Sequence, residues 1–302
     1  MPWLQIKVET APEQAEQYED LLLAAGCAAV TYQDAADQPI FEPDLGTTPL
    51  WSQTVVTGLF AAEHDLQETL ALLRSAQQQL PEIEGRPHPE IKAEILEDKD
   101  WEREWMENYH PMQFGKRLWV CPSWREAPDP NAVNMMLDPG LAFGTGTHPT
   151  TSLCLEWLDS QSLDDQLVVD YGCGSGILGI AALLLGANKV VAVDIDPQAL
   201  TATRDNLERN RLDSSRLSVS LPNATPAVKA DTLVANILAG PLVELAPTLE
   251  ALVRPGGRIL LSGLLADQAD SVSTAYSQWF KMEPAVEKDG WIRLTGTKYQ
   301  DA

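Results

Sequence analysis

Apolar and polar positions alternate in two different ways along the chain. From residue 167 onward, short apolar runs are separated by amphipathic stretches, which is the pattern of strands alternating with helices. It predicts strands at 167–169, 189–194, 216–220, 231–235 and 258–262, and helices from 177 and at 197–210, 240–253 and 266–280. Two final strands are expected at 281–287 and 291–298, joined by Lys-Asp-Gly. The pattern therefore predicts an α/β fold with a doubly wound, mostly parallel sheet whose last strand runs antiparallel.

The first hundred residues follow a different order. Strands are expected at 3–9, 28–32, 54–60 and 91–96, with helices at 12–25 and 65–80. The order βαββαβ is that of a small α+β ferredoxin-like domain, which we assign to residues 1–97. Residues 98–130 are interpreted as a charged linker helix, carrying Trp101 and Trp105, followed by a connecting segment with a strand at 118–121. Residues 131–302, which begin with a strand at 134–137, form the larger α/β domain.

A glycine-rich turn follows the first strand of the larger domain. Gly172, Gly174 and Gly176 allow the backbone to bend tightly, and the N–H groups of the next helix point back toward them. Asp170 closes the strand before this turn, and Asp194 ends the next strand. Two carboxylates at successive strand ends predict a site for a nucleotide-type ligand.

Two cofactors compete for this site. Residues 174–179 contain the letters GxGxxG, which suggest a dinucleotide, although the match alone is weak. Asp170 would repel a pyrophosphate but suits a ligand with cationic sulfonium and amino groups. Asp194 can accept hydrogen bonds from both ribose hydroxyls of either cofactor. Residue chemistry therefore favours S-adenosylmethionine over a nicotinamide cofactor.

Two further segments carry candidate site residues. The loop at 139–151 contains three glycines, Phe143, Thr145 and His148, and leads through Thr151 into a helix over 150–158. A long polar loop beside a nucleotide site is typical of a lid or ligand clamp. His148 is a candidate general base or, alternatively, a structural hydrogen-bond partner. Asn236 follows a strand at the sheet edge where ligands bind, and its amide can accept a hydrogen bond from an incoming amine.

Charge narrows the choice of partner. The formal net charge of the 302 residues is −23, and residues 1–97 alone hold 17 acidic and 4 basic residues. Such a chain should repel nucleic acid and attract a basic partner, although charge can also serve solubility alone.

The four cysteines are scattered, with no metal-ligand spacing, and no apolar run reaches membrane-spanning length. With no signal peptide visible, we expect a cytoplasmic protein with neither a metal nor a membrane partner.

Several motifs together resemble one known family. The strings DPGLAFGTGTHPTT (138–151), VVDYGCGSGILGIAAL (168–183), VDIDPQAL (193–200), ANILAGPL (235–242) and PGGRILLSGLL (255–265), with MPW at the start and EDKDWEREWMENYHPM before the second domain, are similar to the bacterial methyltransferases of ribosomal protein L11. The resemblance covers nearly the whole chain. It implies a class I methyltransferase domain of seven strands, preceded by a domain that holds the substrate protein and a helical linker that lets this domain swing.

The same resemblance implies an activity and site residues. It implies transfer of methyl groups from S-adenosylmethionine to several amino groups of that basic ribosomal protein, lysine side chains and the N-terminal amine, up to trimethylation, with S-adenosylhomocysteine as product. The matching cofactor-contacting positions are Thr151, Gly172, Asp194 and Asn236, and the same motifs hold Phe143, Thr145, His148 and Gly174. Asn236 is the candidate for orienting the amine. The alternatives are a methyltransferase of another basic protein, of a small molecule or of nucleic acid (which the charge disfavours), a nicotinamide-dependent oxidoreductase, or a catalytically silent binding protein.

Overall fold

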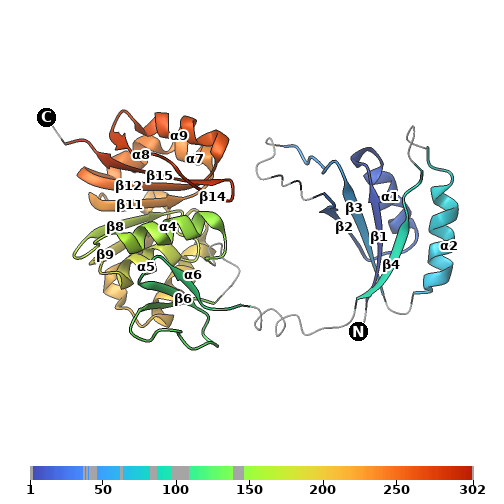
Figure 1. Ribbon diagram of the computed structural model, residues 1–302, viewed down its shortest axis with the longest axis horizontal. Coiled ribbons are helices and arrows are strands. Elements are labelled where there is room, and N and C mark those ends of the chain that lie inside the picture. The colour runs from blue at the N-terminus through green and yellow to red at the C-terminus, as the bar shows by residue number, and fades with distance from the viewer. Residues whose placement is uncertain are drawn as a thin grey trace. The chain divides into compact units, whose positions relative to one another are not determined.

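The computed structural model divides the chain into two compact units (Figure 1). They span Met1–Met106 and Glu107–Ala302. The residues that the structure describes are 3–36, 38, 40, 46–61, 64–81, 87–96, 109–138 and 146–300. The charged helix expected over 98–108, with Trp101 and Trp105, therefore lies outside the described residues.

The first unit is a four-stranded antiparallel sheet with two helices. The strands stand in the order β2-β3-β1-β4, which confirms the ferredoxin-like arrangement expected from the sequence. Its elements are β1 (Trp3–Thr10), α1 (Pro12–Ala24), β2 (Ala29–Asp34), β3 (Thr54–Ala61), α2 (Leu66–Gln77) and β4 (Ile91–Leu96). Alternate residues of β1, namely Leu4, Ile6 and Val8, are buried with Tyr18 and Leu22 of α1. The period of two thus gives the strand one apolar face, and the helices cover it.

The second unit is built on an eight-stranded sheet with the order β10-β9-β8-β11-β12-β15-β13, and β14 also pairs with β15. Neighbours from β10 to β12 are parallel, whereas β15 is antiparallel to β12, β13 and β14. The strands are β8 (Leu167–Tyr171), β9 (Lys189–Val193), β10 (Leu217–Ser220), β11 (Ala230–Asn236), β12 (Val253–Leu265), β13 (Phe280–Met282), β14 (Val286–Lys288) and β15 (Trp291–Lys298). This topology confirms the doubly wound, mostly parallel sheet with an antiparallel last strand.

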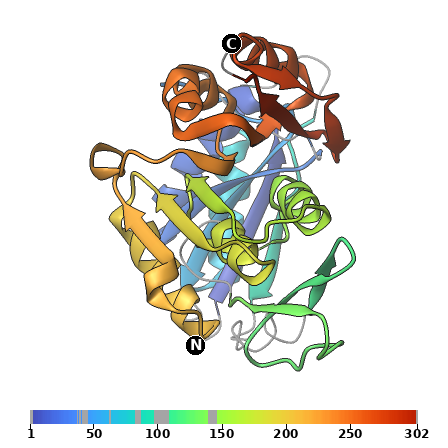
Figure 2. The same ribbon diagram turned by 90° about the vertical axis from the view of Figure 1, so that its left-hand side faces the viewer.

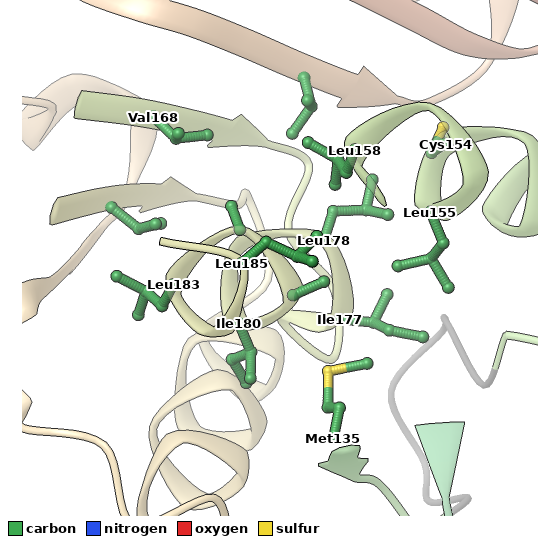
Figure 3. Packing of buried hydrophobic residues seen from close by; sticks show 14 of the residues in the cluster. Met135, Cys154, Leu155, Leu158, Val168, Ile177, Leu178, Ile180, Leu183 and Leu185 are labelled. Carbon is green, nitrogen blue, oxygen red and sulfur yellow. The ribbon is translucent and has the colours of Figure 1, made fainter. Parts of the chain in front are cut away.

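Helices cover both faces of this sheet, because successive side chains of each buried strand point to opposite sides. Val168 packs in a core with helices α4, α5 and α6, and its neighbour Val169 packs in a second core with α7, α8 and α9. The helices are α4 (Pro149–Ser160), α5 (Ile177–Leu184), α6 (Pro197–Arg209), α7 (Ala239–Glu244), α8 (Ala246–Leu252) and α9 (Ala269–Tyr276). Figure 3 shows Ile177 and Leu178 of α5 among side chains from α4 and β8. The buried α5 therefore holds the glycine turn that precedes it against the sheet.

A smaller sheet in the same unit has the order β5-β6-β7. Its strands are β5 (Met112–Phe114), β6 (Leu118–Cys121) and β7 (Val133–Met136). The sequence predicts β6 and β7, the latter with a shift of one residue, but not β5. Three residues between Pro111 and Gly115 are too few to show a period. Figure 2, which turns the view of Figure 1 by 90°, shows this sheet in green.

Several other predicted elements have different bounds in the structure, and the strand expected over 281–287 is two strands, β13 and β14. The helix expected over 240–253 is two helices, α7 and α8, separated at Leu245, because Pro247 has no N–H to continue the first one. The turn expected at Pro255-Gly256-Gly257 lies inside β12, where the pairing of β12 with β11 shifts register. The helix expected over 266–280 begins as a 3-10 turn over Ala266–Gln268 and ends at Tyr276, before β13.

Candidate functional site at the carboxyl ends of β8, β9 and β11

The turn between β8 and α5 requires glycine. Gly172, Gly174 and Gly176 have φ angles of 78°, 54° and 78°, in the left-handed region that other residues rarely adopt. A Cβ on Gly172 would also overlap the Ile237 side chain, and one on Gly176 would lie 2.7 Å from Cγ2 of Thr203. The turn therefore brings bare backbone to the carboxyl edge of the sheet, directly before the N-terminus of α5. This confirms the strand-turn-helix predicted from the sequence.

The turn is also joined to the neighbouring strand β9. The N–H groups of Gly172 and Cys173 both donate to the Val193 carbonyl oxygen, at 2.7 and 3.0 Å. Asp194, the residue after β9, accepts from the Gly174 N–H through Oδ2 at 2.8 Å and from the Asp196 N–H through Oδ1 at 3.0 Å. Asp194 is half-buried. Each carboxylate oxygen has a further lone pair, so Asp194 can still accept hydrogen bonds from a ligand.

Asp170 is the least solvated acid of the site, with 1% of its surface exposed. It lies within β8, one residue before the strand ends, rather than closing the strand as expected. Its Oδ2 accepts from the Gly179 N–H at 2.8 Å, but its buried Oδ1 has no hydrogen-bond partner among the described residues. Burial raises the pKa of Asp170 to about 7, the Asp194 charge adds to the rise, and the Gly179 hydrogen bond opposes it. A cationic ligand group would stabilise its ionised form.

Asn236 and Thr151 meet at the next strand. Asn236 is the last residue of β11, which pairs with β8, and its Nδ2 lies 3.4 Å from Oγ1 of Thr151. Thr151 is fully buried in the first turn of α4. The Asn236 amide is therefore held at the carboxyl edge of the sheet by α4, one strand from Asp170. The contact between Ile237 and the Gly172 position joins this segment to the glycine turn.

His148 caps α4, as the sequence predicts for the Thr-His-Pro-Thr segment. Its Nδ1 accepts from the Thr150 N–H at 3.3 Å and lies 2.7 Å from the Thr150 hydroxyl. Its ring makes an edge contact with Trp291, with centroids 4.7 Å apart and planes at 70°. Burial lowers the pKa of His148, so the ring is neutral near pH 7.

The structure thus brings seven of the nine predicted residues to one edge of the sheet. They are His148, Thr151, Asp170, Gly172, Gly174, Asp194 and Asn236. The other two, Phe143 and Thr145, lie outside the described residues. Trp291 was not predicted; its only signal was an aromatic residue opening a strand beside a Lys-Asp-Gly turn.

Throughout the part of the chain that the structure describes, no three His, Cys, Asp or Glu side chains are grouped to hold a metal, and no helix has the length and apolarity to span a bilayer.

Known proteins match this chain from end to end. A family model described as ribosomal protein L11 methyltransferase (PrmA) matches residues 2–299. Proteins with that name from Marinomonas sp. (strain MWYL1) and Pseudomonas aeruginosa (strain LESB58) are each 58% identical, over 299 and 301 residues. These alignments cover 99% and 100% of this chain and the whole of each relative. A crystal structure of ribosomal protein L11 methylase from Lactobacillus delbrueckii subsp. bulgaricus is 30% identical, with a TM-score of 0.57, and covers 64% of this chain and 100% of its own.

Proposed function

The chain belongs to the ribosomal protein L11 methyltransferase family, and we propose that it transfers methyl groups from S-adenosylmethionine to lysine side chains and the N-terminal amine of ribosomal protein L11, up to trimethylation. The observation that carries the proposal is the glycine turn between two carboxylates, with the Asn236 amide on the adjacent strand. A ribosomal-protein substrate also implies that the reaction takes place in the cytoplasm.

The residues of the site fit S-adenosylmethionine in their chemistry. In our proposal, the Asp194 carboxylate accepts hydrogen bonds from the ribose hydroxyls, and bare backbone at Gly172 and Gly174 allows close approach. Asp170 supplies a buried carboxylate oxygen without a partner among the described residues, which suits the cationic end of the ligand. A pyrophosphate would meet that carboxylate unfavourably. This disfavours the nicotinamide alternative despite the GxGxxG letters.

The chemistry then requires a neutral amine held in line with the transferred group. S-adenosylmethionine supplies, when bound, a methyl group on a sulfonium, so that an amine nitrogen can bond to the methyl carbon while the carbon–sulfur bond breaks and a thioether leaves. Asn236 is proposed to accept a hydrogen bond from the acceptor amine through its amide oxygen, while its Nδ2 contacts Thr151. Its contribution is to orient the nitrogen lone pair. Because a lysine amine is largely protonated at neutral pH, desolvation at the site must favour its neutral form.

No side chain is assigned as a dedicated base in this proposal. His148 is the histidine candidate, but its Nδ1 accepts from the Thr150 N–H and the ring caps α4. We therefore propose that it positions α4 and that the amine loses its proton to solvent.

The proposed function is tested directly with purified ribosomal protein L11. The protein is incubated with S-adenosylmethionine labelled in the methyl group, and the product is analysed by mass spectrometry. We expect mass additions of whole methyl groups on lysine and N-terminal amino groups, up to three on each. A second basic ribosomal protein serves as the control for specificity. Absence of label from L11, with S-adenosylmethionine bound, would reject L11 as the substrate.

Removing the Asp194 carboxylate should weaken cofactor binding. Asp194→Ala loses a charged acceptor for the ribose, worth about 1.5–3 kcal/mol, so the Kd for S-adenosylmethionine should rise about ten- to a hundredfold. Titration calorimetry measures this directly. Because Asp194 also accepts from the Gly174 N–H, the melting temperature of the variant must be recorded as well. An unchanged Kd in a folded variant would remove Asp194 from the proposed ribose site.

Cofactor binding should also depend on the ionisation of Asp170. Burial raises its pKa to about 7, so most of this carboxyl is protonated at pH 6 and ionised at pH 8. If only the ionised form holds the cationic ligand, affinity should rise about tenfold from pH 6 to pH 8. In the ligand-free protein, raising the pH has the opposite, unfavourable effect on folding stability, because the folded state keeps a proton that the unfolded state loses near pH 4. This residue's contribution to stability therefore falls as the pH rises from 4 to 7.

Asp170→Asn separates this effect from other titrations. Its affinity for S-adenosylmethionine should be lower at pH 8 and nearly independent of pH between 6 and 8. Calorimetry at three pH values measures both proteins. A variant with the same pH dependence as the natural protein would show that another group titrates.

A further inference from the structure

Trp291 occupies a distinct place near the candidate site. It is the first residue of β15, half-buried, and opposite Leu265 at the carboxyl end of β12. It is also opposite Lys288 across the tight turn that joins β14 to β15. Residues Asp289 and Gly290 of that turn have positive φ angles of 52° and 80°. Trp291 therefore belongs to a short hairpin at the same sheet edge as Asn236.

This hairpin is fixed to α4. The Lys288 ammonium donates to Ser152 Oγ at 2.6 Å and to Glu156 Oε1 at 3.0 Å. The Trp291 ring contacts the His148 ring at the start of the same helix. Three contacts, made by two hairpin side chains, thus hold the hairpin against α4 and its N-cap. The contact with His148 therefore contributes to the placement of the Trp291 ring.

The same helix turn connects Trp291 with Asn236. Thr151, three residues after His148, contacts the Asn236 amide. In the sheet order β9-β8-β11-β12-β15, Asp194 follows β9, Asp170 lies in β8 and Asn236 ends β11. The proposed function places the cofactor at the two carboxylates and the acceptor amine at Asn236, farther along this line. The next positions along the line belong to β12 and β15, and therefore to the hairpin with Trp291.

We propose that Trp291 lines the acceptor site and determines its specificity: its aromatic face holds the partly methylated ammonium between successive methyl transfers. This inference rests on the proposed function. An unmodified ammonium has three N–H donors, and each added methyl group replaces one of them. A dimethylated ammonium keeps one donor, so hydrogen bonding holds it only weakly between transfers, whereas an aromatic face still attracts its positive charge until it loses its last proton and becomes the neutral acceptor. The cation opposite Trp291 is Lys288, whose ammonium is bound to Ser152 and Glu156 of α4. The neutral His148 ring adds no further positive charge beside Trp291.

The test compares product distributions at equal total methyl incorporation. Trp291→Leu keeps an apolar side chain but removes the aromatic face, and Trp291→Phe keeps a smaller aromatic ring. With L11 as substrate, the ratio of trimethylated to monomethylated product should fall about three- to thirtyfold in Trp291→Leu. The Phe variant should lie between this value and that of the natural protein. Mass spectrometry of partially reacted L11 gives the distributions.

Two controls distinguish this role from a structural one. Trp279→Leu removes a half-buried tryptophan that packs on the second core, away from α4, and should leave the distribution unchanged. Calorimetry with S-adenosylmethionine should give the same Kd for the natural protein and all three variants. Trimethylated L11, prepared with the natural protein, should also inhibit Trp291→Leu about three- to thirtyfold less strongly.

Each failure has its own meaning. An unchanged distribution in Trp291→Leu, or the same shift in Trp279→Leu, overturns the role of Trp291 and leaves the proposed function standing. A natural protein that binds S-adenosylmethionine but does not methylate L11 overturns the proposed function, and this inference with it.

Discussion

Asn236→Ala should lower kcat for L11 methylation about a hundredfold while raising the Kd for S-adenosylmethionine much less. The amide is proposed to orient the acceptor nitrogen, and loss of orientation costs about two orders of magnitude in comparable reactions. A residue that only binds cofactor would instead lose binding and turnover together. Steady-state kinetics at saturating cofactor, together with calorimetry, separate the two effects.

Thr151→Val extends the same test, because it removes the hydroxyl that the Asn236 amide contacts but keeps the side-chain volume. We expect a smaller loss of kcat, about tenfold, since the amide remains but is less well held. Asn131→Ala, in the exposed turn before β7, is a matched control and should change neither quantity. Equal losses of kcat and affinity in Asn236→Ala would reduce Asn236 to a cofactor-binding residue.

The glycine turn and its two carboxylates were predictable because their chemistry is local. Glycine at every second position from 172 to 176 predicts a tight backbone turn, and all three glycines have positive φ angles in the structure. Asp170 and Asp194 were predictable as neighbours because parallel strands end at the same edge. The mostly parallel, doubly wound sheet followed from the alternation of strands and helices. Local signals were therefore sufficient wherever one short segment makes one element.

The remainder depended on contacts between distant segments. No local pattern shows that the β14–β15 hairpin packs on α4, because the Lys288 contact joins residues more than 130 positions apart. The sequence likewise did not show that the Pro255-Gly256-Gly257 segment lies within a strand, since the pairing of the flanking residues Val253 and Arg258 with distant strands decides that. His148 was ambiguous between base and cap for the same reason. Only its neighbours in the fold, Thr150 and Trp291, distinguish the roles.

A protein consisting of residues 107–302 should bind S-adenosylmethionine almost normally yet methylate L11 at least about a hundredfold more slowly at low substrate concentration. The second unit has its own two cores and holds every candidate cofactor residue, so we expect it to fold alone. We propose that the first unit captures L11. On its helix α1, Glu13, Glu16 and Asp20 are exposed, and Lys7 on β1 is paired with Glu94. A tethered capture site raises the effective concentration of substrate about 10²- to 10⁴-fold, and truncation removes this gain.

Salt dependence makes the test of capture sharper. If the acidic unit attracts basic L11, methylation by the full chain at low substrate should slow as ionic strength rises, chiefly through slower association. The truncated protein should show a weaker salt dependence, because it lacks the acidic surface of the first unit. Free lysine analogues at high concentration provide the control, since they need no capture and should react equally slowly with both proteins. If the truncated protein modified L11 as fast as the full chain, the first unit could not be the substrate-binding domain. If the truncated protein reacts with lysine analogues at the rate of the full chain but no longer methylates L11 at low substrate concentration, capture belongs to the first unit and methyl transfer to the second.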